Sequence, residues 1–116
     1  VLGDLLSLAA PVSAPSSLVH ADLRGNVLFA PGRPAAVIDL SPYWRPPDHA
    51  AAIVLVDALA WGRARDDVLD LVADVEQIDQ LLRRACVFRL VAAVRVHRDR
   101  GTDGRARSRP GPVPGE

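Results

Sequence analysis

The sequence contains no lysine and no methionine, it has a single cysteine, and aromatic residues make up only 4% of it. Because Cys86 has no second cysteine to pair with, an intramolecular disulfide is excluded and a reducing compartment such as the cytoplasm is expected. The scarcity of aromatic residues means that valine, leucine, isoleucine and alanine must fill the core. All 14 basic residues are arginine, and 14 acidic residues balance them to a net charge of zero. This balance favours neither an acidic nor a basic partner.

No apolar run is long enough to cross a bilayer. The longest, AAAIVLVDALAW, is interrupted by Asp57 and is shorter than the roughly 20 residues that a spanning helix needs. The opening VLGDLLSLAAPVSA carries Asp4 and lacks the basic front end of a signal peptide. We therefore expect no membrane segment. The chain starts inside a helical pattern without an initiator methionine, so we expect it to be a fragment of a longer protein.

The first part of the chain predicts a helix, a loop and a short strand. The apolar pattern of VLGDLLSLAA is typical of a helix, and Pro11 stops it. PVSAPSS has the composition of a loop, and the LVH that follows predicts a strand that ends near His20.

A hairpin is expected next. VLFA and AAVIDL are rich in valine and isoleucine, and the intervening PGRP is typical of a turn. If Ala30 pairs with Ala35 across a four-residue turn, Asn26 lies opposite Asp39. Two polar side chains then meet at the open end of the hairpin.

Helices are expected to fill the rest of the chain. SPYWRPP is too rich in proline for a regular element and predicts a loop, after which Asp48 should cap a strongly apolar, buried helix that ends near Gly62. A second helix is predicted from residue 66 or 67 to about 80, with Leu71 on its apolar stripe. A third follows through QLLRRACVFRLVAAVRVH. From His97 onward no apolar periodicity remains, and disorder is expected.

The open end of the hairpin could hold a metal ion. Directly opposed residues have Cβ atoms about 5 Å apart, so the side-chain oxygens of Asn26 and Asp39 can reach one ion. Mg²⁺ prefers hard oxygen ligands and often takes one or two from protein and the rest from water and phosphate. Asp22 lies just upstream, where its carboxylate could orient a substrate hydroxyl and accept its proton. His20 is better placed to brace this loop by hydrogen bonding.

HADLRGN, followed by VLF, a turn and AVIDL, resembles the catalytic loop and metal-binding hairpin of the aminoglycoside phosphotransferase and choline kinase family, relatives of the protein kinases. The resemblance implies that Asp22 is the catalytic aspartate, that Asn26 and Asp39 are metal ligands, and that His20 and Asp57 support the catalytic loop. It further implies Mg²⁺ and ATP as cofactors and a small-molecule hydroxyl as phosphate acceptor. The match covers residues 20–61.

The chain departs from the family in two ways. Only three residues separate Asp22 from Asn26, one fewer than in the kinase loop H-R-D-x-x-x-x-N. There is also no glycine-rich phosphate loop and no lysine. The amino-terminal, nucleotide-binding lobe is therefore absent from this chain, and nucleotide-binding residues stay unassigned. We therefore expect an α+β, mostly helical, partial kinase-like carboxyl-terminal lobe over residues 1–96. Its catalytic loop and hairpin occupy 18–40, its helical subdomain 48–96, and a disordered tail 97–116.

Other interpretations stay open beside this one. The chain could be a catalytically dead kinase-like interaction module, with self-association or a partner covering the surface that the other lobe would bury. Asp57 could simply reach solvent, and Tyr43 and Trp44 could either line a substrate pocket or cover a core edge. We expect His49 and His97 to be exposed and Cys86 to be buried. The arginine-rich tail lacks interleaved aromatics, so a solvated tail is expected rather than a nucleic-acid partner.

Overall fold

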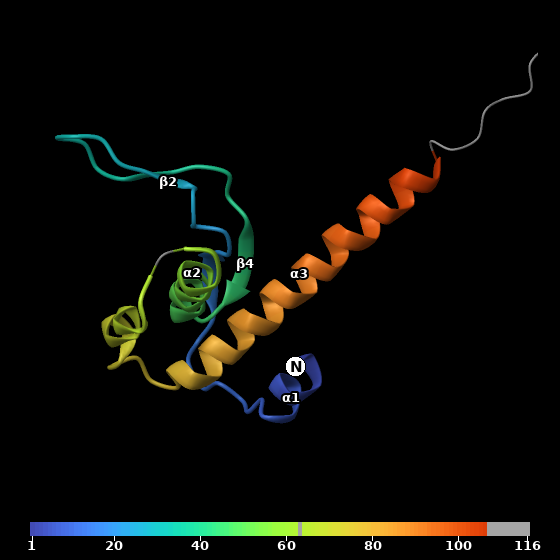
Figure 1. Ribbon diagram of the computed structural model, residues 1–116. Coiled ribbons are helices and arrows are strands. Elements are labelled where there is room, and N and C mark those ends of the chain that lie inside the picture. The colour runs from blue at the N-terminus through green and yellow to red at the C-terminus, as the bar shows by residue number, and fades with distance from the viewer. Residues whose placement is uncertain (63, 107–116) are drawn as a thin grey trace, which may run out of the picture.

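The computed structural model describes residues 1–62 and 64–106, with side chains through residue 100. It is a mixed α+β fold in which about half of the residues are helical, with small two-stranded antiparallel sheets, and this confirms the expected class. The elements in order are α1 (Leu2–Ser7), β1 (Ser17–His20), β2 (Val27–Leu28), β3 (Ala36–Val37), β4 (Pro42–Arg45), α2 (Pro47–Trp61), the 3₁₀ helix η1 (Asp66–Val72) and α3 (Ile78–Ala106). Figure 1 shows α3 as a long rod beside the other elements. The hairpin that contains β2 projects away from α2 and β4.

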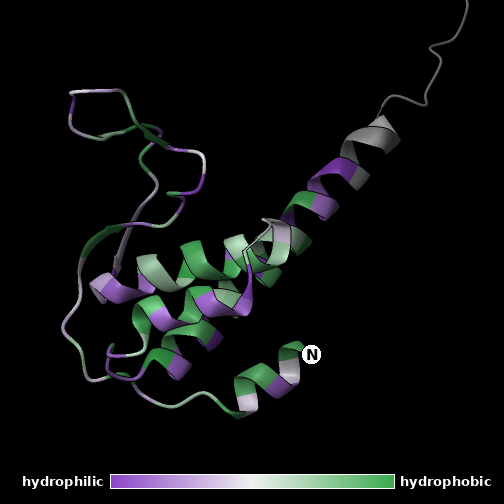
Figure 2. Ribbon diagram, turned by 60° about the vertical axis from the view of Figure 1, so that its left-hand side comes forward, coloured by the Kyte–Doolittle hydropathy of each residue, from purple (hydrophilic) through white to green (hydrophobic). Residues whose placement is uncertain are grey.

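The core lies where α2 crosses the first half of α3 and the end of β1. Its centre is small and aliphatic, as the composition predicts, and Figure 2 shows that α2 and the adjoining part of α3 are rich in hydrophobic residues. The central buried residues are Ala21, Ala52, Ile53, Leu81 and Ala85. Among the described residues no helix combines the length and the apolarity needed to cross a membrane.

The prediction of a loop for SPYWRPP is wrong, because Pro42–Arg45 forms β4. This strand pairs antiparallel with β1, with Leu18 opposite Trp44 and His20 opposite Pro42. A proline is tolerated here because it stands at the first position of an edge strand, where no ladder hydrogen bond from its nitrogen is required. Pairing with β4 holds the end of β1, and therefore His20, in place.

The predicted register of the hairpin is also wrong by one residue. Val27 pairs with Val37, and the backbone N–H of Ile38 donates to the carbonyl oxygen of Asn26 at 2.9 Å, so Asn26 lies opposite Ile38 rather than Asp39. The reason is the turn, in which Gly32 has φ +70° and the N–H of Arg33 donates to Ala30. Pro34 then has no N–H to donate, and regular pairing resumes only at β3.

The start of α2 differs from the prediction as well, whereas its end agrees. Pro46 is the N-cap residue and Pro47 begins the helix, a position that proline favours, so Asp48 lies inside the first turn and does not cap it. The helix ends at Gly62, where a Cβ atom would lie 2.4 Å from the carbonyl oxygen of Ala58. Only glycine fits at this position, because any Cβ atom would collide with the backbone of Ala58.

The predicted second helix is broken. Residues 66–72 form η1, and Gln77, with φ +58°, separates this segment from α3. Because a 3₁₀ helix has 3.0 residues per turn instead of 3.6, the apolar stripe expected of an α-helix is not kept. Val72 is buried, but Leu71 is 80% exposed.

The third predicted helix is α3, which continues well past His97. The helix runs to Ala106, so the disorder predicted from His97 is wrong for residues 97–106, and residues 107–116 lie outside the described part of the chain. Once a helix is nucleated by packing, each added residue gains one backbone hydrogen bond, which lets it extend beyond the core. The predicted helix before Pro11 is confirmed as α1.

Candidate functional site

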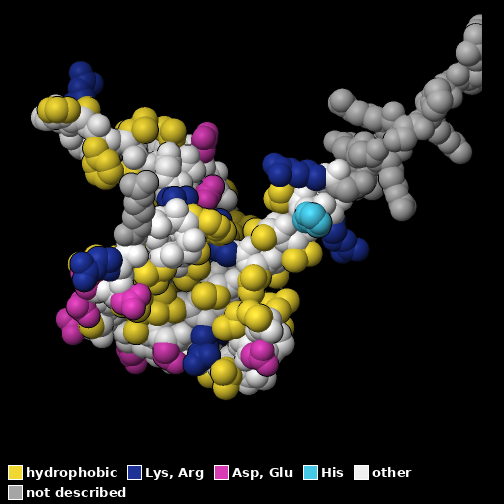
Figure 3. All heavy atoms as spheres, viewed as in Figure 1, with side chains coloured by type: hydrophobic (Ala, Val, Ile, Leu, Met, Phe, Trp, Pro, Cys, Tyr) yellow, Lys and Arg dark blue, Asp and Glu magenta, His cyan; other side chains and the backbone are white. Residues whose placement is uncertain are grey.

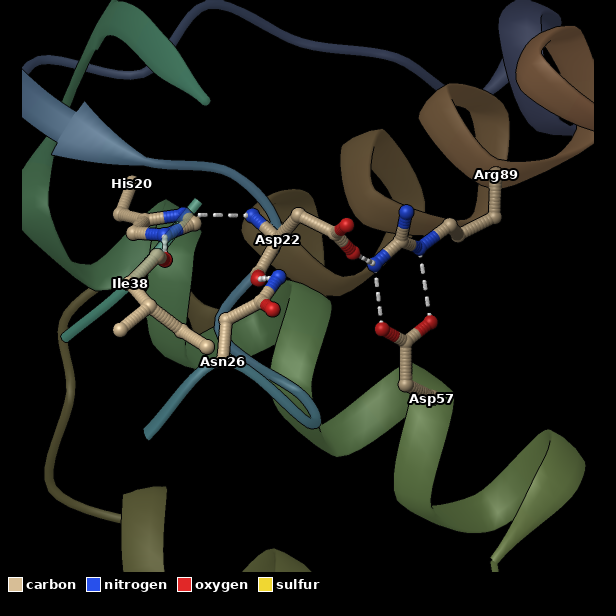
Figure 4. A network of polar contacts seen from close by, with 6 residues as sticks. All are labelled: His20, Asp22, Asn26, Ile38, Asp57 and Arg89. Carbon is tan, nitrogen blue, oxygen red and sulfur yellow. Dashed lines mark hydrogen bonds and ion pairs between the residues drawn. The ribbon is translucent and has the colours of Figure 1, made fainter. Parts of the chain in front are cut away.

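His20 joins the two segments that carry the candidate site residues. It is buried at the end of β1, and its Nδ1 accepts a hydrogen bond from the backbone N–H of Asp22 at 3.0 Å. Its Nε2 lies 3.1 Å from the carbonyl oxygen of Ile38. The two contacts fix the neutral tautomer with the proton on Nε2, since one ring nitrogen accepts and the other must donate. The expected bracing role of His20 therefore has a concrete geometry (Figure 4).

Asn26 closes the loop that begins at Asp22. Its Nδ2 donates to the backbone oxygen of Asp22 at 2.7 Å, and its N–H donates to Leu23 at 2.9 Å. Gly25 has φ +81°, which a turn residue without a Cβ adopts at little cost. This turn accommodates the short spacing between Asp22 and Asn26. The side-chain Oδ1 of Asn26 makes no hydrogen bond with any residue in the described part of the chain.

Arg89 on α3 ties Asp22 to Asp57. Its Nε lies 2.7 Å from Oδ1 of Asp57, its Nη2 contacts Oδ2 of the same carboxylate, and Nη2 also lies 3.0 Å from Oδ1 of Asp22. Figure 4 shows the guanidinium between the two carboxylates. Asp57 is therefore connected to the loop through Arg89, and its predicted role as a support of that loop stays a prediction.

Burial divides this network into a structural and an accessible half. The side chain of Asp57 is 3% exposed and that of Arg89 is 18% exposed, whereas that of Asp22 is 51% exposed. Burial disfavours the charged guanidinium, but hydrogen bonds to Asp57 and Asp22 outweigh it and raise the pKa of Arg89 above its ordinary value. A buried carboxylate is tolerated only with such a partner. Oδ2 of Asp22 has no hydrogen-bond partner among residues 1–62 and 64–100, whose side chains the structure describes.

Asp39 lies one residue beyond the pairing of Asn26 with Ile38. It is exposed and has φ +49°, so the chain leaves the extended conformation at this residue. Such backbone is uncommon for a residue with a Cβ, although aspartate tolerates it, and it often marks functional positions. The structure thus brings Asp22, Asn26 and His20 into one hydrogen-bonded unit and attaches Asp39 to that unit only through the backbone of Ile38.

Asn26 and Asp39 carry oxygen donors of the kind that a hard cation takes, but they form no dense acidic cluster, and the register of the hairpin does not pair them directly. Within the described residues there is no group of three or more histidine, cysteine or acidic side chains that could hold a metal. Asn26 and Asp39 would offer one amide oxygen and one carboxylate, a number that Mg²⁺ commonly takes from protein when phosphate and water supply the rest. The chemistry of these two side chains therefore fits the expected cation.

Several flanking predictions have mixed outcomes. His49, expected to be exposed, is buried at 5% exposure, and its ring lies edge-on to Phe88 of α3. His97 is exposed as predicted, and Cys86 is only partly buried. Tyr43 packs edge-on against Phe88 with ring centroids 5.4 Å apart.

Sequence reasoning missed Arg89. One signal was available, since Arg89 is a single charge in the apolar run CVFRLVAAV and Asp57 is a single charge in another apolar run. Opposite charges isolated in two buried helices are expected to pair. Beside Arg89 lies a hollow of about 390 Å³ lined in part by Trp61, Val96 and His97.

Comparisons of the chain with protein-family models, with curated proteins and with solved structures gave no match. Functional inference therefore depends on the residues and their geometry.

Proposed function

We propose that this chain carries the phosphate-transfer end of an ATP- and Mg²⁺-dependent small-molecule phosphotransferase of the aminoglycoside phosphotransferase and choline kinase type. The observation that carries the proposal is the bridge made by His20. It links the N–H of Asp22 to the carbonyl oxygen of Ile38 and so ties the loop of Asp22 and Asn26 to the residue that precedes Asp39. These are the residue types, in the same order, that the resemblance in sequence implies.

Each residue would have a separate task. Asp22 would accept a hydrogen bond from the acceptor hydroxyl through its Oδ2, while Arg89 holds Oδ1. Asn26 and Asp39 would hold Mg²⁺, which when bound neutralises charge on the phosphoryl oxygens. Arg89 and Asp57 would position the Asp22 carboxylate from behind.

The chain would need a second component to complete the nucleotide site for phosphotransfer. It has no lysine to contact phosphate and no glycine-rich loop, so the amino-terminal lobe expected of this family would have to come from another part of the protein. Phosphotransfer by the chain alone is therefore expected to be negligible. Binding of Mg²⁺ and nucleotide, which needs fewer groups, is the property to measure first.

A thermal melt with and without Mg²⁺ and ATP tests the proposal. A ligand at one hundred times its dissociation constant stabilises the native state by about 2.7 kcal/mol, which shifts the midpoint of a small domain by several degrees. We expect a shift in the native chain and none in Asp39→Asn. Asp70→Asn, which changes an exposed carboxylate outside the site, is the matched control and should keep the shift. A cooperative melt that Mg²⁺ and ATP leave unchanged contradicts the proposal.

A catalytically inactive interaction module is the second candidate, and the exposed hairpin favours it. Hydrophobic side chains follow the projecting hairpin (Figure 3), and Phe29 is 82% exposed. Exposed apolar groups of this kind often mark an interface. Asp22→Asn would abolish phosphotransfer in the complete protein and leave such an interface intact, whereas Phe29→Ser would weaken self-association or partner binding without affecting Mg²⁺ and nucleotide.

A further inference from the structure

A second candidate site lies away from Asp22, in a groove between α1, β4 and α3. The groove has a volume of about 680 Å³, which is within the range of about 300–1,000 Å³ found for small-molecule sites. Most of its lining is aliphatic. The apolar surface comes in part from Leu5, Val12, Leu81, Val87 and Val91.

Side-chain hydrogen bonds fix the outer wall of the groove to α3. Gln80 accepts from the N–H of Ala10 at 2.8 Å, and Arg84 donates to the carbonyl oxygen of Ala10 at 2.6 Å. Gln77 accepts from the N–H of Ser13 at 2.9 Å. The segment after α1 is therefore held by specific contacts far apart in the sequence, which gives the groove a defined shape.

The charged part of the lining has one sign. Four arginines line the groove, and none of its described lining residues is acidic. Such a surface attracts anions and disfavours cations. The four are Arg45, Arg83, Arg84 and Arg95.

Two buried polar atoms of the lining residues have no partner. Nδ1 of His49 and Nε of Arg83 are both buried and make no hydrogen bond with any described residue. A buried polar atom without a partner costs free energy, and most such atoms in native proteins are satisfied. Both residues line the same groove, so a small rotation of either side chain that brings its buried nitrogen to the groove surface would let an acceptor oxygen of a ligand satisfy it.

We propose that this groove binds a small amphipathic monoanion, a medium-chain carboxylate, with its carboxylate at Arg83 and His49 and its chain along the aliphatic wall. The proposal does not depend on the phosphotransferase proposal, because it uses none of the site residues named above. Burial, together with the positive charges of Arg45 and Arg84, lowers the pKa of His49 and keeps its imidazole neutral near neutral pH. A neutral imidazole can carry its proton on Nδ1 and donate it to a carboxylate.

Calorimetric titration of the chain with decanoate below its micelle concentration tests this proposal. Octanol and decyltrimethylammonium serve as neutral and cationic probes with comparable chains, and butyrate as an anion with a short chain. We expect decanoate to bind at least tenfold more tightly than each of the three. Equal affinity for octanol would show that the arginines contribute nothing and would overturn the proposal.

Two variants locate the binding site. Arg83→Gln should weaken decanoate binding at least tenfold, whereas Arg65→Gln, an exposed arginine outside the groove, should leave it unchanged. Val91→Trp fills the groove from a partly exposed position and should abolish binding while circular dichroism stays native. Unchanged decanoate binding in both Arg83→Gln and Val91→Trp places the ligand elsewhere and overturns the proposal.

Two further measurements on the same chain and variants distinguish two other possible occupants of the groove. If the groove serves a lipid surface, the chain will bind vesicles of phosphatidylglycerol and not monomeric decanoate. If a second copy of the chain fills the groove, sedimentation will show a dimer that Val91→Trp dissociates. Either result overturns the carboxylate proposal.

Discussion

Arg89 and Asp57 join α3 to α2 by a two-point contact, with Nε of the arginine 2.7 Å from Oδ1 of the aspartate. The Asp57 carboxylate is almost fully buried, and 32 positions of sequence separate it from Arg89. The same guanidinium reaches Asp22 at 3.0 Å. A contact that holds the core together therefore also positions the proposed catalytic carboxylate.

Arg89→Leu should lower the free energy of unfolding by roughly 3–5 kcal/mol, because it leaves the buried Asp57 carboxylate without a partner. Arg95→Leu changes an exposed arginine on the same helix and should cost less than about 0.5 kcal/mol. Urea unfolding measures both. The double variant Asp57→Leu with Arg89→Leu should recover most of the loss, since no buried charge remains. A double variant no more stable than Arg89→Leu would argue against the pairing.

His20→Ala should cost roughly 1–3 kcal/mol, since it removes both hydrogen bonds that the buried ring makes to the loop and the hairpin. Amide hydrogen exchange gives the sharper test. The N–H of Asp22 should exchange at least tenfold faster in His20→Ala, because it loses its acceptor. His97→Ala, at an exposed position, is the control and should change neither quantity. Unchanged exchange at Asp22 in His20→Ala would contradict the bridge.

Gly62→Ala should destabilise the protein by roughly 1–3 kcal/mol, because the added Cβ would lie 2.4 Å from the backbone oxygen of Ala58. Gly3→Ala adds the same methyl group where nothing lies within 4 Å and should be neutral or slightly stabilising. Thermal melts of the two variants make the comparison. Similar melting midpoints in the two variants would contradict the close approach of residue 62 to the backbone of Ala58.

Stability should fall as the medium becomes mildly acidic, because of His49. Its pKa in the folded protein is lowered from 6.5 by burial and by the charges of Arg45 and Arg84, so between the lowered value and 6.5 the unfolded chain binds more protons than the native one. The contribution is fully present above pH 6.5 and is lost as the pH falls from there toward the lowered pKa.

Urea unfolding between neutral and mildly acidic pH measures this slope. His49→Gln carries no titrating ring and should flatten the slope in that window, whereas His97→Gln should leave it as it is. An unchanged slope in His49→Gln would assign the pH dependence to other groups.

Local patterns were enough to predict some elements, and their limits have physical causes. The apolar run that forms α2 and the glycine that ends it are strong signals, because helix burial and close backbone approach each restrict the residue type. The hairpin register was not predictable by counting, because the turn closes at Arg33 and Pro34 cannot pair. The strand β4 was missed, because the prolines at 42, 46 and 47 point to a loop, although Tyr43 and Trp44 favour a strand and pairing with β1 stabilises it.

In the candidate site, too, the residues of one local motif were predictable and the contacts between distant segments were not. Asp22, Asn26 and His20 lie within seven consecutive positions, so one short motif contains them and the structure places them in one hydrogen-bonded loop. Arg89 comes from α3, and the isolated charges of Arg89 and Asp57 suggest that the two pair, but no local pattern shows that Arg89 also reaches Asp22. The assumed pairing of Asn26 with Asp39 depended on the register and failed with it.

Paramagnetic broadening by Mn²⁺, a substitute for Mg²⁺, tests the proposed metal site most directly. In amide spectra recorded with ATP, we expect signals of Asn26 and Asp39 to broaden first in the native chain and in Asp70→Asn, and to stay sharp in Asp39→Asn. Broadening that begins instead at the acidic residues of η1, or that persists unchanged in Asp39→Asn, would contradict a metal and nucleotide site at the base of this hairpin.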